Sequence, residues 1–299
     1  MTAKKESTYF MYFPGNYRWS SAFINMMSSA PYGGSEISEL HKIGIQLKDK
    51  DPEDDEAWFH ACVNVADKVR AHAERFEASK HATSAAHAYL RACNYYQMAE
   101  RFRTPKDDVA LAAYKKGVDC FHRHVALTDV KIEIVEIPTA AGPLPGYFVH
   151  AQNSTAGRNP CVVRFGGFDT QKEIQYLRGV PDLVRRGFSC LLVDGPGQGE
   201  AIRFRGMHMR HDFDIAGSAA LDYCYEHAFS DEHMVDAEDI KRTAHATVCE
   251  ENGCKKPPTC GWEGCWAEFC STHCEEDMVE VVRHPLSVDC PKCGAELTP

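Results

Sequence analysis

The sequence has no long apolar run. No stretch approaches the roughly 18 to 20 apolar residues that span a bilayer. The first ten residues, MTAKKESTYF, contain two lysines with no apolar signal core after them. A membrane-spanning helix and a cleaved secretory signal are therefore not expected. We predict a soluble, cytoplasmic protein with no membrane partner.

The sequence also lacks an excess of positive charge. Its 299 residues carry 33 basic and 43 acidic side chains, which gives a formal net charge of −10. Proteins that bind phosphate backbones need basic groups to displace counterions, so no nucleic-acid partner is expected. The hydrophobic fraction of 44% is high enough for a buried core. The composition therefore indicates a globular protein.

Strand-like alternation is missing from about Ser35 to Ala126, where apolar residues recur at helical spacing among Ala, Glu, Lys and Arg. One helix is predicted to begin at the acidic run Asp51–Asp55, with Pro52 at a first helical position, and to run toward Phe76. The acidic side chains would there face the positive end of the helix dipole.

Two further helices are predicted in the same block. One runs from about Thr83 to Phe102, and the segment TPKDD (Thr104 to Asp108) starts the next. Residues 1–127 are therefore predicted to form a helical region.

A sheet is predicted to begin at about Thr128, where the hydrophobic period changes. The segment VKIEIVEIP (Val130 to Pro138) alternates apolar and polar residues as a half-buried strand does. After a turn around Gly142 and Pro143, LPGYFVHA (Leu144 to Ala151) is expected to pair with it as a hairpin.

The next segments indicate a βαβ unit with parallel strands. Pro160 to Phe165 and Phe188 to Asp194 are short apolar runs, separated by a predicted helix from Lys172 to Arg186. Another helix is predicted from about Phe213 to His227, after which the composition shifts to acids, His and Cys. The fold class is thus predicted as α/β, with three regions: 1–127, 128–225 and 226–299.

Two glycine-containing loops follow the predicted parallel strands. The loop after the first strand reads GGFDTQKE and the loop after the second reads DGPGQGE, where α/β enzymes place their chemistry. Gly166 and Gly167 could present main-chain N–H groups, with that of Phe168, to an oxyanion. The alternative is that both loops are only tight strand-to-helix turns.

The run PCVVRFGGFDTQKE, a helix and then GFSCLLVDGPGQGEA resemble the corresponding segment of the dihydroxypseudooxynicotine hydrolase branch of esterase-like α/β-hydrolases. The resemblance extends back through LPGYFVH and covers roughly residues 10 to 225. It implies an N-terminal helical cap over a partial α/β-hydrolase sheet. It also implies a small-molecule substrate, and no cofactor for the hydrolase-like part.

The same resemblance implies roles for the two loops. Gly166, Gly167 and Phe168 would belong to the oxyanion-hole loop. The loop bordering the pocket would contain Asp194, Gly195, Pro196, Gly197, Gln198 and Gly199. Asp194 would not be the acid of the catalytic triad, which comes later in the family.

The sequence departs from the family where the nucleophile should follow. No G-x-S-x-G elbow occurs. The nearest string, AGSAA with Ser218, lies inside a predicted helix and has alanine at both glycine positions of the motif. Cys265 in GWEGCWAEF has no preceding strand and no glycine pair around it. The acid and histidine of a triad are missing as well. We therefore predict a protein related to hydrolases of esters or carbon–carbon bonds whose catalysis is impaired.

Eight of the 14 cysteines are crowded between Cys249 and Cys293, whereas the other six are scattered through apolar segments as core residues. The closing C-P-K-C-G places two thiolates on one knuckle, which is typical of zinc sites. Zinc is the predicted cofactor, iron is an alternative, and so is a disulfide-bonded or disordered tail. The candidate ligands are Cys249, Cys254, Cys260, Cys265, Cys270, His273, Cys274, Cys290 and Cys293.

These donors are sufficient for two four-ligand sites, although their spacing leaves the pairing open. One arrangement uses Cys249, Cys254 and Cys270 with His273 or Cys274 for the first site. The second site then uses Cys260, Cys265, Cys290 and Cys293. Metal would supply much of the folding free energy of so short a segment. The alternative function is a non-catalytic zinc-binding interaction protein, built on a truncated hydrolase scaffold, that binds a protein partner through this tail.

Overall fold

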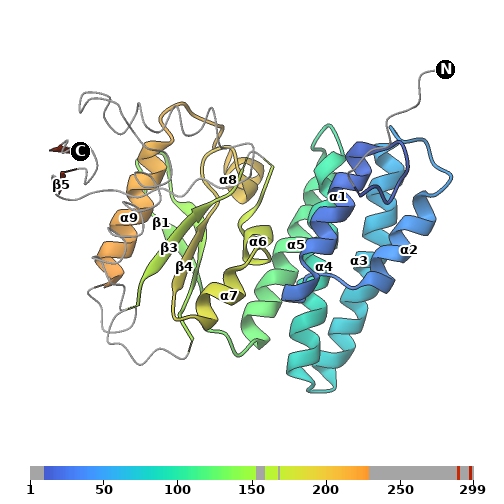
Figure 1. The fold of residues 1–299 in the computed structure, drawn as a ribbon, viewed down its shortest axis with the longest axis horizontal. Coiled ribbons are helices and arrows are strands. Elements are labelled where there is room, and N and C mark those ends of the chain that lie inside the picture. The colour runs from blue at the N-terminus through green and yellow to red at the C-terminus, as the bar shows by residue number, and fades with distance from the viewer. Residues whose placement is uncertain (1–9, 153–158, 168, 229–287, 290–295, 298–299) are drawn as a thin grey trace. The chain divides into compact units, whose positions relative to one another are not determined.

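The computed structural model describes residues 10–152, 159–167, 169–228, 288–289 and 296–297 (Figure 1). The chain divides into two compact units, Met1–Asp129 and Val130–Pro299. The described part of the first unit is helical, and the second contains a small mixed sheet with its own helices. A helical region followed by a sheet with helices is the α/β arrangement that the sequence predicts.

The helical unit contains five α-helices and one 3₁₀ turn in its described part, and α4 packs against both α3 and α5. The elements are α1 (Tyr17–Ser28), η1 (Ala30–Tyr32), α2 (Ile37–Leu47), α3 (Asp55–Ala78), α4 (Ala82–Phe102) and α5 (Asp108–Leu127). Because α4 lies between two neighbours, its small alanines and even Tyr95 and Tyr96 are buried. The indole of Trp58 on α3 donates to the carbonyl oxygen of Met98 on α4 over 2.8 Å.

The expected start of the helix near residue 51 is wrong by a few residues. The helix begins at Asp55, and Pro52 lies in the turn before it. The reason is the side chain of Asp54, which accepts a hydrogen bond from the N–H of Ala57 at 2.8 Å and so caps the helix. The predicted start at TPKDD is confirmed, because Asp107 caps α5 in the same way.

The sheet has the strand order β1-β2-β4-β3. Its strands are β1 (Ile132–Ile137), β2 (Leu144–Val149), β3 (Cys161–Phe165) and β4 (Ser189–Val193). The predicted hairpin is confirmed, because β1 and β2 are antiparallel neighbours, and so is the predicted parallel pair β3 and β4. Strand β2 also pairs antiparallel with β4, which makes the sheet mixed.

Helices lie on both faces of this sheet, with α9 on one side and α6 and α7 on the other (Figure 1). The helices are α6 (Lys172–Tyr176), α7 (Val180–Arg185), α8 (Gly199–Arg205) and α9 (Asp214–Ala228). The expected single helix from 172 to 186 is wrong. Gly179 has a left-handed φ of 90° and Pro181 follows in the first turn of α7, so the chain breaks and restarts there.

Two further two-residue strands, β5 (Val288–Asp289) and β6 (Glu296–Leu297), pair antiparallel near the C-terminus. The core of the sheet unit forms where apolar residues of β1, β3 and β4 meet Ala216, Ala220 and Leu221 of α9. All six cysteines outside the tail are buried and form no disulfide, which confirms their prediction as core residues.

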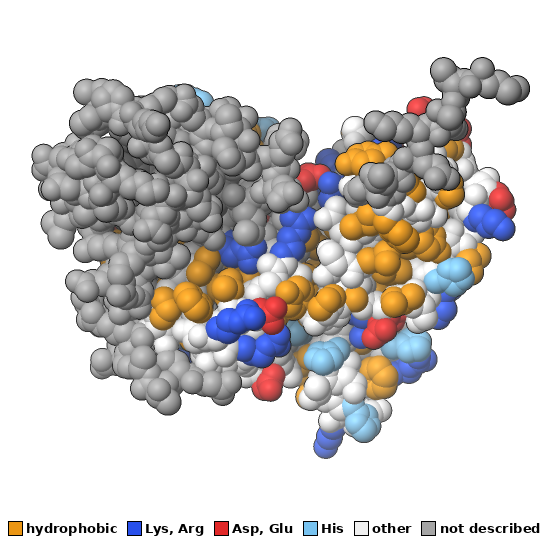
Figure 2. Space-filling view, viewed as in Figure 1, with side chains coloured by type: hydrophobic (Ala, Val, Ile, Leu, Met, Phe, Trp, Pro, Cys, Tyr) orange, Lys and Arg blue, Asp and Glu red, His pale blue; other side chains and the backbone are white. Residues whose placement is uncertain are grey.

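On the surface of the helical unit, hydrophobic side chains lie next to basic, acidic and histidine side chains (Figure 2). Ile45 is 59% exposed and Phe76 38%. Single exposed apolar residues of this kind are ordinary on globular proteins. Across the described part of the chain, no helix combines the length and the hydropathy required to cross a bilayer.

Candidate functional site

The two glycine-containing loops that follow β3 and β4 are joined by the side chain of Gln198. Its Nε2 donates to the carbonyl oxygens of Gly166 and, over 3.3 Å, of Gly167. Its Oε1 accepts from the N–H of Gly195 at 3.0 Å. The buried side-chain amide of Gln198 therefore uses both its nitrogen and its oxygen to hold the loop after β4 against the loop after β3.

A buried ionic cluster lies directly behind these loops. Nζ of Lys172, at the start of α6, lies 3.0 Å from Oδ2 of Asp194 and 2.8 Å from Oε1 of Glu173, and it also pairs with Glu200. The side chain of Lys172 is 1% exposed, and those of Asp194 and Glu173 are fully buried. The hydroxyl of Tyr147 on β2 donates to Oε1 of Glu173 over 2.6 Å.

Asp194 also receives main-chain hydrogen bonds from both loops. The N–H of Lys172 donates to Oδ1 at 2.8 Å, and the N–H of Glu200 donates to Oδ2 at 3.0 Å. This carboxylate thus closes the first turn of α6 and the first turn of α8 at once. In the described structure it holds the starts of α6 and α8 against the end of β4.

The charges in the cluster shift one another's titration. Burial alone would lower the pKa of Lys172, but the carboxylates of Asp194, Glu173 and Glu200 raise it above its ordinary value. Burial raises the pKa of Asp194, against the opposing effect of the Lys172 ammonium. Lys172 is therefore a cation held in the interior by its acidic neighbours.

Two glycines permit this close packing. Gly199 has a φ of +39°, and a Cβ there would lie 2.0 Å from Oδ2 of Asp194. A Cβ on Gly166 would lie 2.5 Å from the carbonyl oxygen of Thr170. Glycine is therefore required at both positions if the loops are to keep this arrangement.

The structure brings together most of the residues that the sequence predicts for the two loops. Gly166 and Gly167 lie against the loop that contains Asp194, Gly195 and Gln198. Gly197 has a left-handed φ of +86°, and its N–H donates to the carbonyl oxygen of Met207 at 2.7 Å. Phe168 lies outside the described residues.

Sequence reasoning missed the residues behind the loops, namely Lys172, Glu173, Tyr147 and Gln175. The signal that could have found the first two is their position directly after the glycine loop, where a lysine and a glutamate begin a helix that must face the sheet. No sequence signal indicates a role for Tyr147, because tyrosine is a common residue in a strand such as β2.

No nucleophile elbow is present in the described residues near these loops. Ser218 lies inside α9, as predicted, and a residue in the middle of a helix cannot take the strained turn of an elbow. The other nucleophile considered, Cys265, lies outside the described residues.

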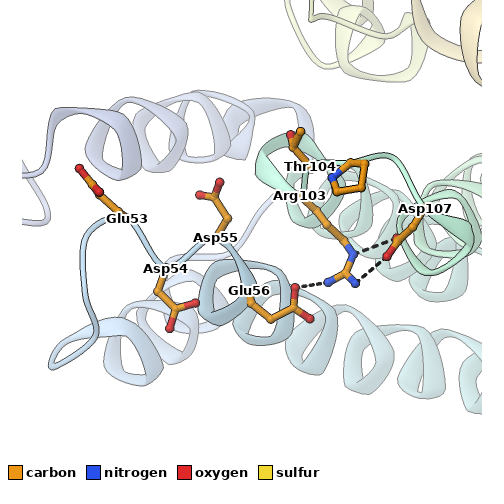
Figure 3. A pocket seen from close by; sticks show the side chains of 8 residues that line it. Glu53, Asp54, Asp55, Glu56, Arg103, Thr104 and Asp107 are labelled. Carbon is orange, nitrogen blue, oxygen red and sulfur yellow. Dashed lines mark hydrogen bonds and ion pairs between the residues drawn. The ribbon is translucent and has the colours of Figure 1, made fainter.

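The helical unit has a shallow pocket of its own, of about 290 Å³ (Figure 3). It is lined by Glu53, Asp54, Asp55, Glu56, Arg103, Thr104, Pro105 and Asp107. The guanidinium of Arg103 lies between Glu56 and Asp107 and lowers the pKa of Asp107 to about 2. Asp54 caps α3 and Asp107 caps α5, while Asp55 and Glu56 form ion pairs, so helix ends and ion pairs explain these four acidic side chains.

The candidate zinc ligands lie outside the described residues: Cys249, Cys254, Cys260, Cys265, Cys270, His273, Cys274, Cys290 and Cys293. Among the residues that the structure describes, no group of three or more His, Cys, Asp or Glu side chains could hold a metal ion.

Comparison with known proteins identifies the relatives of this chain. It is 33% identical over 216 residues to the hydrolase LUC6 of Fusarium sp, and 34% identical over 206 residues to the 20-hydroxy-prefusarin hydrolase FUS2 of Gibberella moniliformis. It is also 28% identical over 239 residues to the α/β hydrolase ucsC of Acremonium sp. The chain belongs to the α/β-hydrolase superfamily.

The alignment with LUC6 covers 71% of this chain but only 51% of LUC6. The alignment with FUS2 covers 67% of this chain but only 48% of FUS2. The chain thus spans about half the length of the curated relatives it matches. Among solved structures, its fold is similar to that of the 2,6-dihydroxy-pseudo-oxynicotine hydrolase. That similarity has a TM-score of 0.54 at 20% identity, and it covers 67% of this chain and 53% of the other.

A separate match falls on the tail of this superfamily member. Residues 249–282 match the model of the EsV-1-7 cysteine-rich motif. The match contains seven of the nine candidate metal ligands, all except Cys290 and Cys293. A cysteine-rich motif is compatible with metal binding.

Proposed function

We propose that this protein binds a carbonyl-bearing small molecule at the loop of Gly166 and Gly167, as a hydrolase binds its substrate. We further propose that residues 1–299 do not hydrolyse this molecule, because they provide no nucleophile. The observation that carries this proposal is the locked pair of loops after β3 and β4. Their arrangement is held by hydrogen bonds of the Gln198 and Asp194 side chains. A preorganised loop of this kind can stabilise charge on a carbonyl oxygen without further reorganisation.

The hydrogen-bond pattern of the first loop supports binding of an oxygen atom. The carbonyl groups of Gly166 and Gly167 are engaged by Gln198. Within the described part of the chain, their N–H groups form no turn or loop hydrogen bond to another main-chain group. Main-chain N–H groups are the donors that oxyanion holes use. A ligand carbonyl is the acceptor that fits them.

The proposed loss of turnover follows from the sequence. Acyl transfer by this superfamily requires a nucleophile on a strained turn beside the oxyanion loop. Residues 1–299 contain no G-x-S-x-G segment, and the serine of the nearest string lies in α9. Binding by the loop then occurs without covalent chemistry.

The second part of the proposal concerns the tail, which we regard as a separate region from residue 226 onward. We propose that its cysteines bind zinc, on the basis of the C-P-K-C-G knuckle and of the match to a cysteine-rich motif. If the first proposal fails, the alternative function is a non-catalytic protein that uses this zinc-bound tail to bind a protein partner.

Hydrolysis of p-nitrophenyl acetate by the purified full chain tests the catalytic part. The expected rate equals that of the buffer after correction for non-specific reaction with surface lysines, which a urea-unfolded sample measures. A rate that saturates with substrate and disappears on unfolding would show that a nucleophile is present, contrary to this proposal.

A further inference from the structure

Gln175 on α6 is a buried amide whose side chain has no hydrogen-bond partner among the described residues. Its side chain is 2% exposed, and neither Nε2 nor Oε1 has a hydrogen-bond partner in the described structure. An amide buried in this way costs free energy comparable to a lost hydrogen bond for each unsatisfied group. Such a side chain requires an explanation, because leucine would fill a similar volume without that cost.

The side chain of Gln175 approaches the glycine loop. Its Nε2 lies 3.1 Å from the position that a Cβ on Gly166 would occupy. The main chain of Gln175 is satisfied, since its N–H donates to Gln171 and its carbonyl accepts from Arg178, each at 3.0 Å. Only the side-chain amide is therefore available, and it lies beside the loop where we place the ligand.

Gln198 provides an internal contrast. Both glutamines are buried beside Gly166, but the amide of Gln198 is saturated by the main chain of the two loops. Gln198 thus holds the two loops together, whereas the side chain of Gln175 has a donor, Nε2, and an acceptor, Oε1, next to each other.

We propose that Gln175 is a ligand-binding residue of this site and that it selects small molecules in which a carbonyl oxygen lies next to an N–H or O–H group. A carboxamide or a hydroxyketone has this pattern: the ligand carbonyl accepts from Nε2, and the neighbouring N–H or O–H donates to Oε1. This inference rests on the proposed function, because the N–H groups of Gly166 and Gly167 must also face the ligand.

Two probes of similar size separate the two proposals. Benzamide has a carbonyl and an adjacent N–H, whereas acetophenone has only the carbonyl. Their affinities for the full chain are measured by ligand-observed NMR titration. We expect benzamide to bind about tenfold more tightly, which is the size of effect that one or two net hydrogen bonds produce.

The variants Gln175→Leu and Gln175→Met should bind benzamide no better than acetophenone. They should also unfold at the same temperature as the wild-type chain or a higher one, because each removes an unsatisfied buried amide. Gln46→Leu, in the helical unit, is the matched control and should keep the wild-type ratio of affinities. Two variants are used so that a packing defect in one does not decide the result.

Three outcomes would overturn the inference. If the Gln175 variants lose thermal stability and keep the ratio of affinities, Gln175 is structural. If the wild-type chain binds both probes equally and Gly166→Ala abolishes both, the loop binds carbonyls but Gln175 does not select them. If the wild-type chain binds neither probe, both the inference and the proposed function fail.

Discussion

The side-chain ammonium of Lys172 lies 3.0 Å from Oδ2 of Asp194, and neither side chain is more than 1% exposed. The pair joins the start of α6 to the loop after β4, and the N–H of Lys172 adds a second bond to the same carboxylate. A buried carboxylate with a cation beside it is tolerated, but one that loses its partner is strongly destabilising. The geometry of both loops therefore depends on this pair.

The first prediction follows directly. Lys172→Met should lower the free energy of unfolding of the sheet unit by about 3 to 5 kcal/mol, because Asp194 and Glu173 remain buried without their cation. Hydrogen exchange measured by mass spectrometry reports on β3 and β4 separately from the helical unit. Exchange should rise in the segments 161–165 and 189–193 and remain unchanged in α4.

The control for this prediction is Arg185→Met, which removes an exposed ion pair with Asp182 on α7. Exposed pairs contribute about 0 to 1 kcal/mol, so this variant should exchange like the wild-type chain. Equal effects of the two substitutions would contradict the importance that we assign to the buried cluster.

The second prediction compares Gly199, the first residue of α8, with Gly206, which follows its last residue. Both have positive φ, +39° at Gly199 and +64° at Gly206, but only a Cβ at Gly199 would meet another atom, at 2.0 Å from Asp194. Gly206→Ala should cost about 1 kcal/mol from backbone strain alone. Gly199→Ala should cost more than about 3 kcal/mol in urea unfolding, because Asp194 must move. Similar costs would show that the contact with Asp194 is not tight.

The third prediction concerns acid stability of the helical unit. Burial lowers the pKa of His124 on α5 from 6.5 to about 4, although Nδ1 donates to the carbonyl oxygen of Ala86 at 3.0 Å. Below pH 6.5 the unfolded chain binds a proton that the folded chain does not bind until about pH 4. Stability is therefore fully present above pH 6.5 and is lost as the pH falls toward 4.

The expected loss from this histidine is about 2 to 3 kcal/mol between pH 7 and pH 4.5. Urea unfolding followed by circular dichroism at both pH values measures it. His124→Asn keeps a donor for the carbonyl oxygen of Ala86 but does not titrate. Between pH 7 and pH 4.5 its free energy of unfolding should therefore fall by about 2 to 3 kcal/mol less than that of the wild-type chain. His60→Asn alters an exposed histidine on α3 and should behave like the wild-type chain. If His124→Asn shows the full acid loss, burial of a neutral histidine is not its cause.

The fourth prediction concerns the tail. If its donors form two tetrahedral sites, the full chain should purify with about two zinc ions, because each site takes four ligands. Replacement of Cys290 and Cys293 with serine should remove about one equivalent and make the tail easier to proteolyse. Substitution of the buried Cys62 and Cys93 with serine should leave the metal content unchanged. Elemental analysis that finds neither zinc nor iron in reduced protein would refute the prediction.

Much of the fold could be predicted from the sequence because its signals are local. The alternation in Ile132–Ile137 and the apolar runs of β3 and β4 determine strands, and Asp107 marks a helix start that the structure confirms. The break at Gly179 was missed, because the flanking residues continue a helical pattern, and only the left-handed φ of this glycine interrupts it.

The candidate site was harder to predict, because its decisive contacts join residues far apart in the chain. Gln198 and Gly166 are brought together only when β3 and β4 pair in parallel. The glycines of both loops were identifiable as loop residues. Nothing local indicates that Gln175 is buried without a partner, since that depends on the packing of α6 against the sheet.

The most direct test of the central claim is the reaction of the full chain with a fluorophosphonate probe, read by intact-protein mass spectrometry. Such probes label serines that an adjacent base activates. We expect no adduct on the chain, because we propose that its loops only bind an oxygen atom and because no serine of the described residues lies on an elbow beside them. One probe per chain, attached to a single serine and lost when the protein is unfolded beforehand, would contradict it.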